Sequence, residues 1–363
     1  MKLTTRLLAV LSCAVLTGMC LAGCEATSSS DSKADSKPQS ASSTENFEPV
    51  DITRGLNLSA LEGKNNPSTY LNSSYLNKEE TYTNIASKGF DHIRLPVDFR
   101  NYANDEGEVK KSFYKRLDKI IDMANDEGLA VMLDFHGWHD FNVSQGDAKL
   151  FLDIWSDVAE HYKDHSNMLM FELINEPHET EGGDLNMDAL TALQTTAIEN
   201  IREISPHRTI VVATAEWNGP WTLWDFDLTQ FDNIIVAVHT YEPMDFTHQG
   251  FSWMGTQDVK LELTDEMLEK LDEQLKLITD FRNRTGMKVV INEFGVNTGG
   301  HISDEDVHRY LSRITAFAEE NDIAWTYWEY NAGFGVYKTK GWGSAKGEWR
   351  ENVLDALLNP NDK

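Results

Sequence analysis

Two stretches, LINEP at 173–177 and VVINEFG at 289–295, decide the fold. In each of them a short apolar run ends in a carboxylate, which is Glu176 in the first and Glu293 in the second. An apolar run of this length is typical of a strand that is buried on both faces. A carboxylate placed where such a strand ends lies at the mouth of a sheet or barrel, outside the apolar core. We therefore expect Glu176 and Glu293 to face each other across one cleft.

Apolar runs recur along the chain, and helical segments separate most of them. The predicted strands cover 52–58, 90–96, 129–135, 168–174, 209–213, 234–238, 289–291 and 323–327. Apolar residues at helical spacing predict helices around 113–124, 268–278 and 307–318, the last with Ser303 as its N-cap. Gly89, Gly128 and Gly286 stand between a helix and the next strand, where helices commonly stop. This α/β alternation predicts a single (β/α)8 TIM barrel. A doubly wound open sheet is the alternative, although no Gly-rich phosphate loop follows the first run.

The carboxyl ends of the strands in such a barrel form the active site. Here they carry amide, charged and aromatic side chains instead of turn-forming residues alone. These side chains are Asn57, Arg94, Asp134, His136, Trp138, Asn175, Glu176, Glu216, Trp217, Asn218, His239, Tyr241, Asn292, Glu293 and Trp328. Their concentration at the carboxyl ends of the strands predicts a functional site at that end of the barrel.

Two carboxyl groups that face each other across a cleft can cleave a glycosidic bond. One protonates the leaving oxygen while the other attacks the anomeric carbon. Two solvated side chains at strand ends are the plainer interpretation of Glu176 and Glu293 taken singly. Taken with the other strand-end residues, the pair favours the catalytic interpretation.

From about Arg54 to the last helix, the sequence resembles glycoside hydrolase family 5, a large family of retaining β-glycanases that includes many cellulases. Its motifs occur in family order, as Arg94, His136, Asn175-Glu176, His239-x-Tyr241, Glu293 and Trp328. The resemblance implies that Glu176 is the general acid/base and that Glu293 is the nucleophile. Their carboxyl groups are then expected ~5–5.5 Å apart, with retention of configuration.

The resemblance also implies roles for residues beside the nucleophile. Arg94 is expected to keep Glu293 charged through a nearby positive charge and a hydrogen bond. Tyr241 is expected to hydrogen-bond Glu293 and orient it. Asn175 is expected to bind the sugar 2-hydroxyl, an interaction that strengthens in the transition state.

Further ring-bearing side chains are expected around the substrate. His136 and His239 are expected to bind hydroxyls or to shape the surroundings of the acid, and Trp328 to form an aromatic floor under the sugar that is cleaved. Trp217 and His248 lie on loops near the mouth and are candidates for sugar contact. Two more tryptophans are expected to be hydrophobic contacts under the long loop after the fifth strand, namely Trp221 and Trp224.

The amino-terminal segment has the pattern of a secretory signal. A basic start is followed by an apolar run and then by Leu21-Ala22-Gly23-Cys24, which resembles a bacterial lipobox. We expect a signal peptide over 1–23, cleavage before Cys24 and lipid on its sulfur, although an ordinary cleaved signal is the alternative. Residues 24–45 are rich in Ser and lack the apolar residues for a core, so we expect a flexible tether. The catalytic domain is expected over 46–363.

The composition limits the partners of this domain. Lys and Arg number 32 and Asp and Glu number 59, which gives a formal net charge of −27. Such a charge disfavours nucleic acid and anionic polymers, and it suits a β-glucan or a related neutral polysaccharide. The 3 cysteines all precede residue 25, so the expected domain has no disulfide or thiolate metal site. No HExxH set is present, and we expect no metal and no cofactor.

Together these features predict a lipid-anchored, extracytoplasmic monomer at the bacterial cell surface or in the periplasm, touching the membrane only through its anchor. Its expected activity is a retaining endo-β-1,4-glucanase. Mannanase, xyloglucanase and mixed-linkage glucanase activities stay open, because subsite loops set these differences. A non-catalytic glycan-binding lipoprotein and a metal-dependent barrel lyase or isomerase are the alternatives from other classes.

Overall fold

The structure is a computed structural model that describes residues 48–62, 74–138, 141–143, 146–179, 185–341 and 343–361. All of these residues belong to one compact unit, residues 43–363. The predicted signal peptide, Cys24 and the predicted tether lie outside the described residues. Among the helices of the described part, none is long and apolar enough to cross a membrane.

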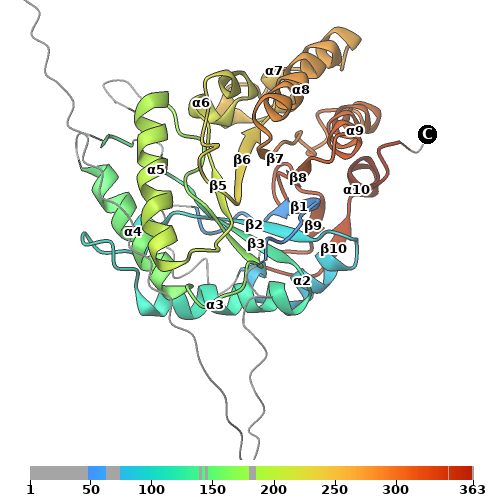
Figure 1. The fold of residues 1–363 in the computed structure, drawn as a ribbon. Coiled ribbons are helices and arrows are strands. Elements are labelled where there is room, and N and C mark those ends of the chain that lie inside the picture. Colours follow the sequence, from blue (N-terminus) through green and yellow to red (C-terminus); the bar gives the residue numbers. More distant parts are fainter. Residues whose placement is uncertain are drawn as a thin grey trace, which may run out of the picture. The chain divides into compact units, whose positions relative to one another are not determined.

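Parallel strands close into a barrel in sequence order, and helices surround it (Figure 1). The first strand pairs with both the second and the last, which closes the ring. The barrel strands are β1 (Arg54–Asn57), β2 (His92–Val97), β3 (Ala130–Phe135), β4 (Leu169–Glu172), β5 (Ile210–Val212), β6 (Ile234–His239), β7 (Lys288–Glu293) and β8 (Ala324–Tyr327). The predicted (β/α)8 barrel is confirmed, and the open sheet is excluded.

The predicted helices and their boundaries are also found. Ser303 caps its helix, with its hydroxyl accepting a hydrogen bond from the Asp306 backbone N–H at 3.1 Å. Gly89, Gly128 and Gly286 have φ values of 89°, 77° and 73°, a left-handed conformation that favours glycine after a helix. The α-helices are α2 (Glu79–Ala86), α3 (Lys111–Asp126), α4 (Asp147–His161), α5 (Met187–Ile204), α6 (Ala215–Asn218), α7 (Met244–Thr247), α8 (Asp265–Thr285), α9 (Asp304–Glu320) and α10 (Glu351–Leu358).

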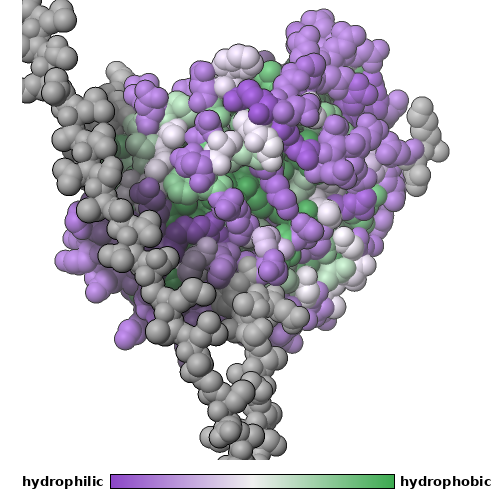
Figure 2. Space-filling model, in the orientation of Figure 1, coloured by the Kyte–Doolittle hydropathy of each residue, from purple (hydrophilic) through white to green (hydrophobic). Residues whose placement is uncertain are grey.

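Short 3-10 helices and one antiparallel strand pair lie in the connections between these helices and strands. The 3-10 helices are η2 (Tyr75–Asn77), η3 (Phe99–Asn101), η5 (Pro220–Trp224) and η6 (Ser252–Met254), and an antiparallel pair is formed by β9 (Tyr337–Thr339) and β10 (Gly347–Trp349). Figure 2 shows hydrophilic residues over most of the face in view and hydrophobic ones mainly in its middle.

The barrel strands separate two apolar layers because successive side chains point to opposite faces. Outward residues such as Ile93 and Leu95 of β2 join the core between strands and helices. Inward residues nearer the amino ends form a second cluster of Ala130, Met132, Met170, Val211, Ile235, Ala237 and Val290. Toward the carboxyl ends the inward positions become polar yet stay buried, and they include Arg94, Asp134, Glu172, His239 and Asn292. The barrel interior is therefore apolar near the amino ends of the strands and polar near their carboxyl ends.

The fourth strand is shorter than predicted. β4 ends at Glu172, whereas the predicted run extends to 174. The backbone N–H groups of Leu173 and Asn175 still donate to neighbouring strands, each at 3.0 Å, so the chain stays at the barrel wall. The path then changes at Glu176, whose φ is 44°. The regular ladder thus stops before the residues that carry the motif.

A buried guanidinium supports the turn between α4 and β4. Arg208 is 1% exposed and lies over the ring of Phe171, 4.9 Å from its centroid. Burial lowers the pKa of Arg208 to about 10, so it stays charged at neutral pH. Its terminal nitrogens donate at 2.7–2.9 Å to the backbone carbonyls of Tyr162, His165, Ser166 and Leu169.

Replacing Arg208 by Met should cost about 3–4 kcal/mol of unfolding free energy, because buried carbonyls lose their donors. Urea denaturation followed by circular dichroism measures this loss. Arg313→Met is the matched control, since Arg313 is 52% exposed and pairs with Asp272 at the surface. The control should lose less than ~1 kcal/mol. Equal losses in the two variants would show that Arg208 has no special structural role.

Candidate active site

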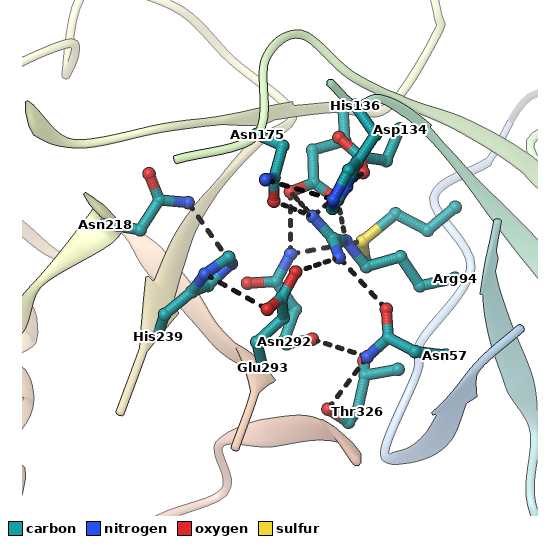
Figure 3. A network of polar contacts seen from close by, with 12 residues as sticks. Asn57, Arg94, Asp134, His136, Asn175, Asn218, His239, Asn292, Glu293 and Thr326 are labelled. Atoms are coloured by element: carbon teal, nitrogen blue, oxygen red, sulfur yellow. Dashed lines mark hydrogen bonds and ion pairs between the residues drawn. The ribbon is translucent and has the colours of Figure 1, made fainter. Parts of the chain in front are cut away.

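The site is organised around Arg94, which projects inward from β2 and is 0% exposed (Figure 3). Its Nε and Nη2 donate to the two oxygens of Glu172, at 2.7 and 2.9 Å. Its Nη1 donates to Glu293 Oε1 at 2.5 Å. Its remaining partners are Asn57 Oδ1 at 3.0 Å, Asn175 Oδ1 at 2.8 Å and Asp134 Oδ2 at 3.0 Å. One side chain thus connects groups from the ends of several strands.

The buried charges at this centre are predominantly negative. Burial alone would lower the pKa of Arg94, but Asp134, Glu172 and Glu293 raise it well above its usual value. Burial raises the pKa of Asp134 to about 7 against the opposing effect of Arg94, and burial also raises the pKa of Glu172. Because one guanidinium cannot neutralise three carboxylates, the cluster retains a proton near neutral pH.

Glu293 is held by a cation and by a phenol. Arg94 approaches one carboxylate oxygen, and the Tyr241 hydroxyl donates to the other at 3.0 Å. Burial and then the Glu293 carboxylate raise the pKa of Tyr241, so its hydroxyl keeps the proton that it donates. A register shift between Val238 and His239 in the β6–β7 pair places Glu293 beside the end of β6. A positive charge and a hydrogen-bond donor thus contact the two oxygens of Glu293.

Glu176 has a different partner, the imidazole of His239. Nδ1 of His239 lies 2.8 Å from Glu176 Oε1, and Nε2 lies 3.4 Å from the amide nitrogen of Asn218. Burial lowers the pKa of His239 to about 4, so the ring is neutral at pH 7. An amide N–H facing Nε2 assigns the ring proton to Nδ1, which then donates to Glu176. Glu176 therefore faces a neutral hydrogen-bond donor, whereas Glu293 faces the Arg94 guanidinium.

The two glutamates lie close together. One oxygen of each and one nitrogen of His239 all lie within 4.8 Å of one another. Among the described residues this trio has the spacing to hold a metal ion. The Arg94 guanidinium already contacts Glu293, however, and its positive charge opposes a second cation there. The trio is better suited to moving a proton than to holding a divalent ion.

Three predicted residues form the opposite wall. His136 Nδ1 contacts Asp134 Oδ2 at 2.8 Å, and its Nε2 lies 3.4 Å from the amide nitrogen of Asn175. The ring of Trp328 lies parallel to that of His136, at 5.9 Å and 14°. Gly295 allows this placement, because a Cβ there would lie 2.2 Å from the Trp328 carbonyl oxygen. The aromatic wall and the glutamates therefore share one mouth.

Two predicted contact residues lie farther from the glutamates. His248 is buried, receives a contact from the Thr247 hydroxyl at 2.9 Å and packs edge-on against Tyr241 at 5.2 Å. Trp217 is exposed and stacks on His178 at 4.5 Å, and His178 Nδ1 contacts the Glu176 carbonyl oxygen at 2.8 Å. His248 thus backs Tyr241, while Trp217 stands on the rim beside Glu176.

The expectation for the two neighbouring tryptophans is wrong. Trp221 and Trp224 are not covered by the loop after β5; they are 49% and 78% exposed. Leu223 between them is the side chain that packs inward, at 1% exposed. Both indoles belong to η5, whose tight turn directs them outward.

Sequence reasoning also missed buried polar residues of the centre. Glu172 sits inside an apolar strand, and Asn292 donates to its Oε1 at 2.8 Å. A carboxylate inside such a run requires a buried partner, and this signal could have identified it. Glu329 follows Trp328, accepts a hydrogen bond from Ser59, and has a pKa raised by burial to about 8. No spacing rule connects Ser59 with Glu329; only barrel closure brings them together.

Comparison with known proteins identifies relatives of this fold and site. Cellodextrinase A of Ruminococcus flavefaciens is 26% identical over 262 residues, which are 68% of this chain and 76% of that protein. Endoglucanase 3 of Fibrobacter succinogenes is 25% identical over 302 residues, 69% of this chain, and the match spans 46% of its length. Among solved structures, Thermotoga maritima Cel5A in complex with cellobiose has a TM-score of 0.75 and 28% identity, covering 87% of this chain and 100% of that one. The same protein in complex with mannotriose has a TM-score of 0.75 and 27% identity, covering 87% and 99%.

The family assignment rests on most of the chain. The family model described as cellulase (glycosyl hydrolase family 5) matches residues 45–333, which include every barrel strand. Glu176, which follows β4, and Glu293, which ends β7, lie within this match. The chain therefore belongs to glycosyl hydrolase family 5, the cellulase family, and is a glycosyl hydrolase.

Proposed function

We propose that this glycosyl hydrolase cleaves internal β-1,4 linkages of a glucan by double displacement, with retention of configuration. The observation that carries the proposal is the contrast between two neighbouring glutamates. Glu293 contacts a guanidinium, whereas Glu176 contacts a neutral imidazole. Carboxyl groups whose surroundings differ in this way take opposite roles as acid and nucleophile.

In the first step Glu176 protonates the glycosidic oxygen as the bond from that oxygen to the anomeric carbon breaks. The bonding electron pair stays on the leaving oxygen, and an oxygen of Glu293 forms the new bond to the anomeric carbon. Arg94 and Tyr241 hold Glu293 charged and correctly oriented for this attack. Asn175 is itself fixed by Arg94, which donates to its Oδ1, and by His136, which faces its amide nitrogen.

In the second step Glu176, now a carboxylate, takes a proton from water. The hydroxide equivalent attacks the anomeric carbon and releases Glu293. His239 remains a hydrogen-bond donor to Glu176 in both states, because its ring stays neutral. One oxygen of Glu176 lies within 4.8 Å of one oxygen of Glu293, which fits the ~5–5.5 Å between the carboxyl groups of retaining enzymes better than the ~6.5–9.5 Å of inverting ones.

The family match and the names of the relatives support a β-glucan as substrate. Cellodextrinase A and Endoglucanase 3 are named for glucan hydrolysis, and Cel5A was captured with cellobiose. Cel5A was also captured with mannotriose, which supports mannan as the second candidate. The strongly acidic composition suits a neutral polymer of either kind. Both glutamates are present, which disfavours a glycan-binding protein without activity.

We further propose that the enzyme is a monomer held outside the cytoplasm by lipid on Cys24. The lipobox-like LAGC at 21–24 and the Ser-rich stretch after it support this arrangement. A tether of this composition would let the domain reach a polymer beyond the membrane surface.

Glu176→Gln and Glu293→Gln should each lower hydrolysis of the preferred glucan by at least ~10²–10⁴-fold. Reducing-sugar release is measured on carboxymethylcellulose, mixed-linkage glucan, xyloglucan and mannan. The two variants should differ on an aryl cellobioside whose phenol leaves without protonation. Glu176→Gln should still release a burst of phenol, whereas Glu293→Gln should release none, because only Glu293 forms the glycosyl bond.

Glu320→Gln is the matched control, since Glu320 is an exposed residue of α9 and its loss should leave every rate unchanged. A burst from Glu293→Gln would reverse the assigned roles. If the parent enzyme hydrolyses mannan faster than every glucan, mannan would replace the glucan as the proposed substrate. If the parent enzyme hydrolyses none of the four polymers, the proposed cleavage of internal linkages would be contradicted.

Cys24→Ala should abolish lipid attachment if the amino-terminal proposal is correct. In a bacterial host, the parent chain should partition into Triton X-114 and incorporate labelled palmitate, and the variant should do neither. Cys20→Ala is the control within the same leader, and it should still be labelled. Labelling that persists in Cys24→Ala would rule out Cys24 as the anchor.

A further inference from the structure

The segment after β5 has an unusual backbone. Glu216, Trp217 and Asn218 have φ values of 52°, 58° and 57°, a left-handed conformation that non-glycine residues rarely adopt. The glycine that follows, Gly219, has an ordinary φ of −65°. The turn therefore places three larger side chains where glycine would be less strained. Strain of this kind persists only where surrounding contacts hold it, and it clusters at functional sites.

Contacts join this left-handed turn to the segment that carries the acid. The backbone N–H of Trp217 donates to the carbonyl oxygen of Pro177 at 3.3 Å, and the Trp217 ring stacks on His178 at 4.5 Å. His178 Nδ1 in turn contacts the carbonyl oxygen of Glu176 at 2.8 Å. The turn and the backbone of Glu176 are thus held in one arrangement.

Asn218 is the side chain of this turn that reaches the catalytic centre. It is 0% exposed, and its amide nitrogen lies 3.4 Å from Nε2 of His239 (Figure 3). Its Oδ1 is also buried and has no hydrogen-bond partner among the described residues. A buried amide oxygen without a partner costs free energy that an apolar side chain would not cost. The turn bears this cost while it presents an N–H to the ring.

The neutral ring of His239 can carry its proton on either nitrogen. With the proton on Nδ1, the ring donates to Glu176 Oε1, which lies 2.8 Å away. The carboxylic proton of Glu176 then occupies its other oxygen and can pass to the leaving group. With the proton on Nε2, Nδ1 would instead accept the carboxylic proton from Oε1, and the acid would point its proton at the ring. The amide of Asn218 opposes this second arrangement, because two N–H groups would face each other.

We propose that Asn218 is a positioning residue for the acid. Its amide keeps the proton of His239 on Nδ1, so that Glu176 presents its own proton to the leaving oxygen. The inference deepens the proposed function and rests on the role of Glu176 as the acid. Asn218 acts through the imidazole, and the left-handed turn is the backbone that brings its amide to Nε2.

Charged groups around His239 make the ring sensitive to a change at position 218. Burial lowers the pKa of His239 to about 4. The charges of Glu293 and Glu172 oppose this shift, and Nδ1 lies 3.6 Å from Glu293 Oε2. Arg94 and His136 act in the same direction as burial. A further carboxylate at position 218 would therefore favour the imidazolium.

Asn218→Asp tests the inference because it keeps the shape of the side chain, tolerates the left-handed conformation and replaces the donor by an acceptor. NMR of the protein with ¹⁵N-labelled histidine shows which ring nitrogen is protonated. The chain has 11 histidines, so the His239 signal is identified by its loss in His239→Gln. At pH 7 the parent should show a proton on Nδ1 alone, and Asn218→Asp should show one on Nε2. A parent with its proton on Nε2, or a variant with the parent's spectrum, would overturn the proposal.

Kinetics provide a readout that a merely structural role would not move. In Asn218→Asp, a cationic His239 would favour the carboxylate of Glu176, so the acid would lose its proton at lower pH. The alkaline limb of the kcat/KM profile should move down by at least ~1 pH unit. At pH values on that limb, kcat/KM for the polymer should fall at least ~10-fold. An aryl cellobioside whose phenol leaves without protonation should lose far less, and equal losses on the two substrates would contradict the inference.

Two further variants separate this role from an effect on folding. Asn218→Gly removes the amide and relieves the left-handed conformation, so its Tm should not fall, while kcat/KM for the polymer should fall more than that for the aryl cellobioside. Asn233→Asp is the matched control, since Asn233 also has a positive φ, of 56°, but precedes β6 at the end opposite to His239. It should keep the parent's tautomer and pH profile.

The outcomes also distinguish this inference from the proposed function. An active parent whose tautomer and pH profile are unchanged by Asn218→Asp would overturn the inference alone. A parent that hydrolyses no glycan would contradict the proposed function, and with it the role that the inference gives to Glu176.

Discussion

The buried guanidinium of Arg94 is the interaction on which the rest of the site depends. It binds Asn57 of β1, Asp134 of β3, Glu172 of β4 and Glu293 of β7, as well as Asn175. Taking such charges out of water costs several kcal/mol per ion unless they are paired and hydrogen-bonded. The pairing therefore fixes the carboxyl ends of distant strands in one arrangement. The apolar cluster below it provides the rigid support that the polar layer needs.

This arrangement gives two glutamates of the same chemistry two different environments. Glu293 receives a positive charge and a phenolic hydrogen bond, and Glu176 receives a hydrogen bond from a neutral imidazole. The low pKa of His239 follows mainly from its burial, so the contrast arises from packing as much as from charge. The surplus of buried carboxylates is accommodated by protonation, with the pKa of Asp134 raised to about 7 by burial. The closed barrel thus brings different partners to two neighbouring carboxyl groups.

The parts that the sequence predicts are those set by local chemistry. Strand runs, helix periodicity and glycine stops follow from neighbouring residues, and so the barrel was predictable. Glu176 and Glu293 were visible because each interrupts an apolar run at its end. Glu172 escaped notice because it lies within such a run, and its partner Arg94 is 78 residues away in sequence. Ser59 and Glu329 meet only when β1 pairs with β8. The outward direction of Trp221 and Trp224 depends on the turn of η5 and on the side chain of Arg284, neither of which has a sequence pattern.

The central claim is that Glu293 forms the bond to sugar while Arg94 keeps it charged. The most direct measurement is mass spectrometry of the enzyme after reaction with a 2-deoxy-2-fluoro cellobioside that carries an activated leaving group, which slows release of a glycosyl-enzyme. The account predicts a single added sugar unit, located by peptide sequencing on Glu293, and no labelling of the Glu293→Gln variant. A label on Glu176 or on any other residue, or turnover with inversion and no label, would contradict it.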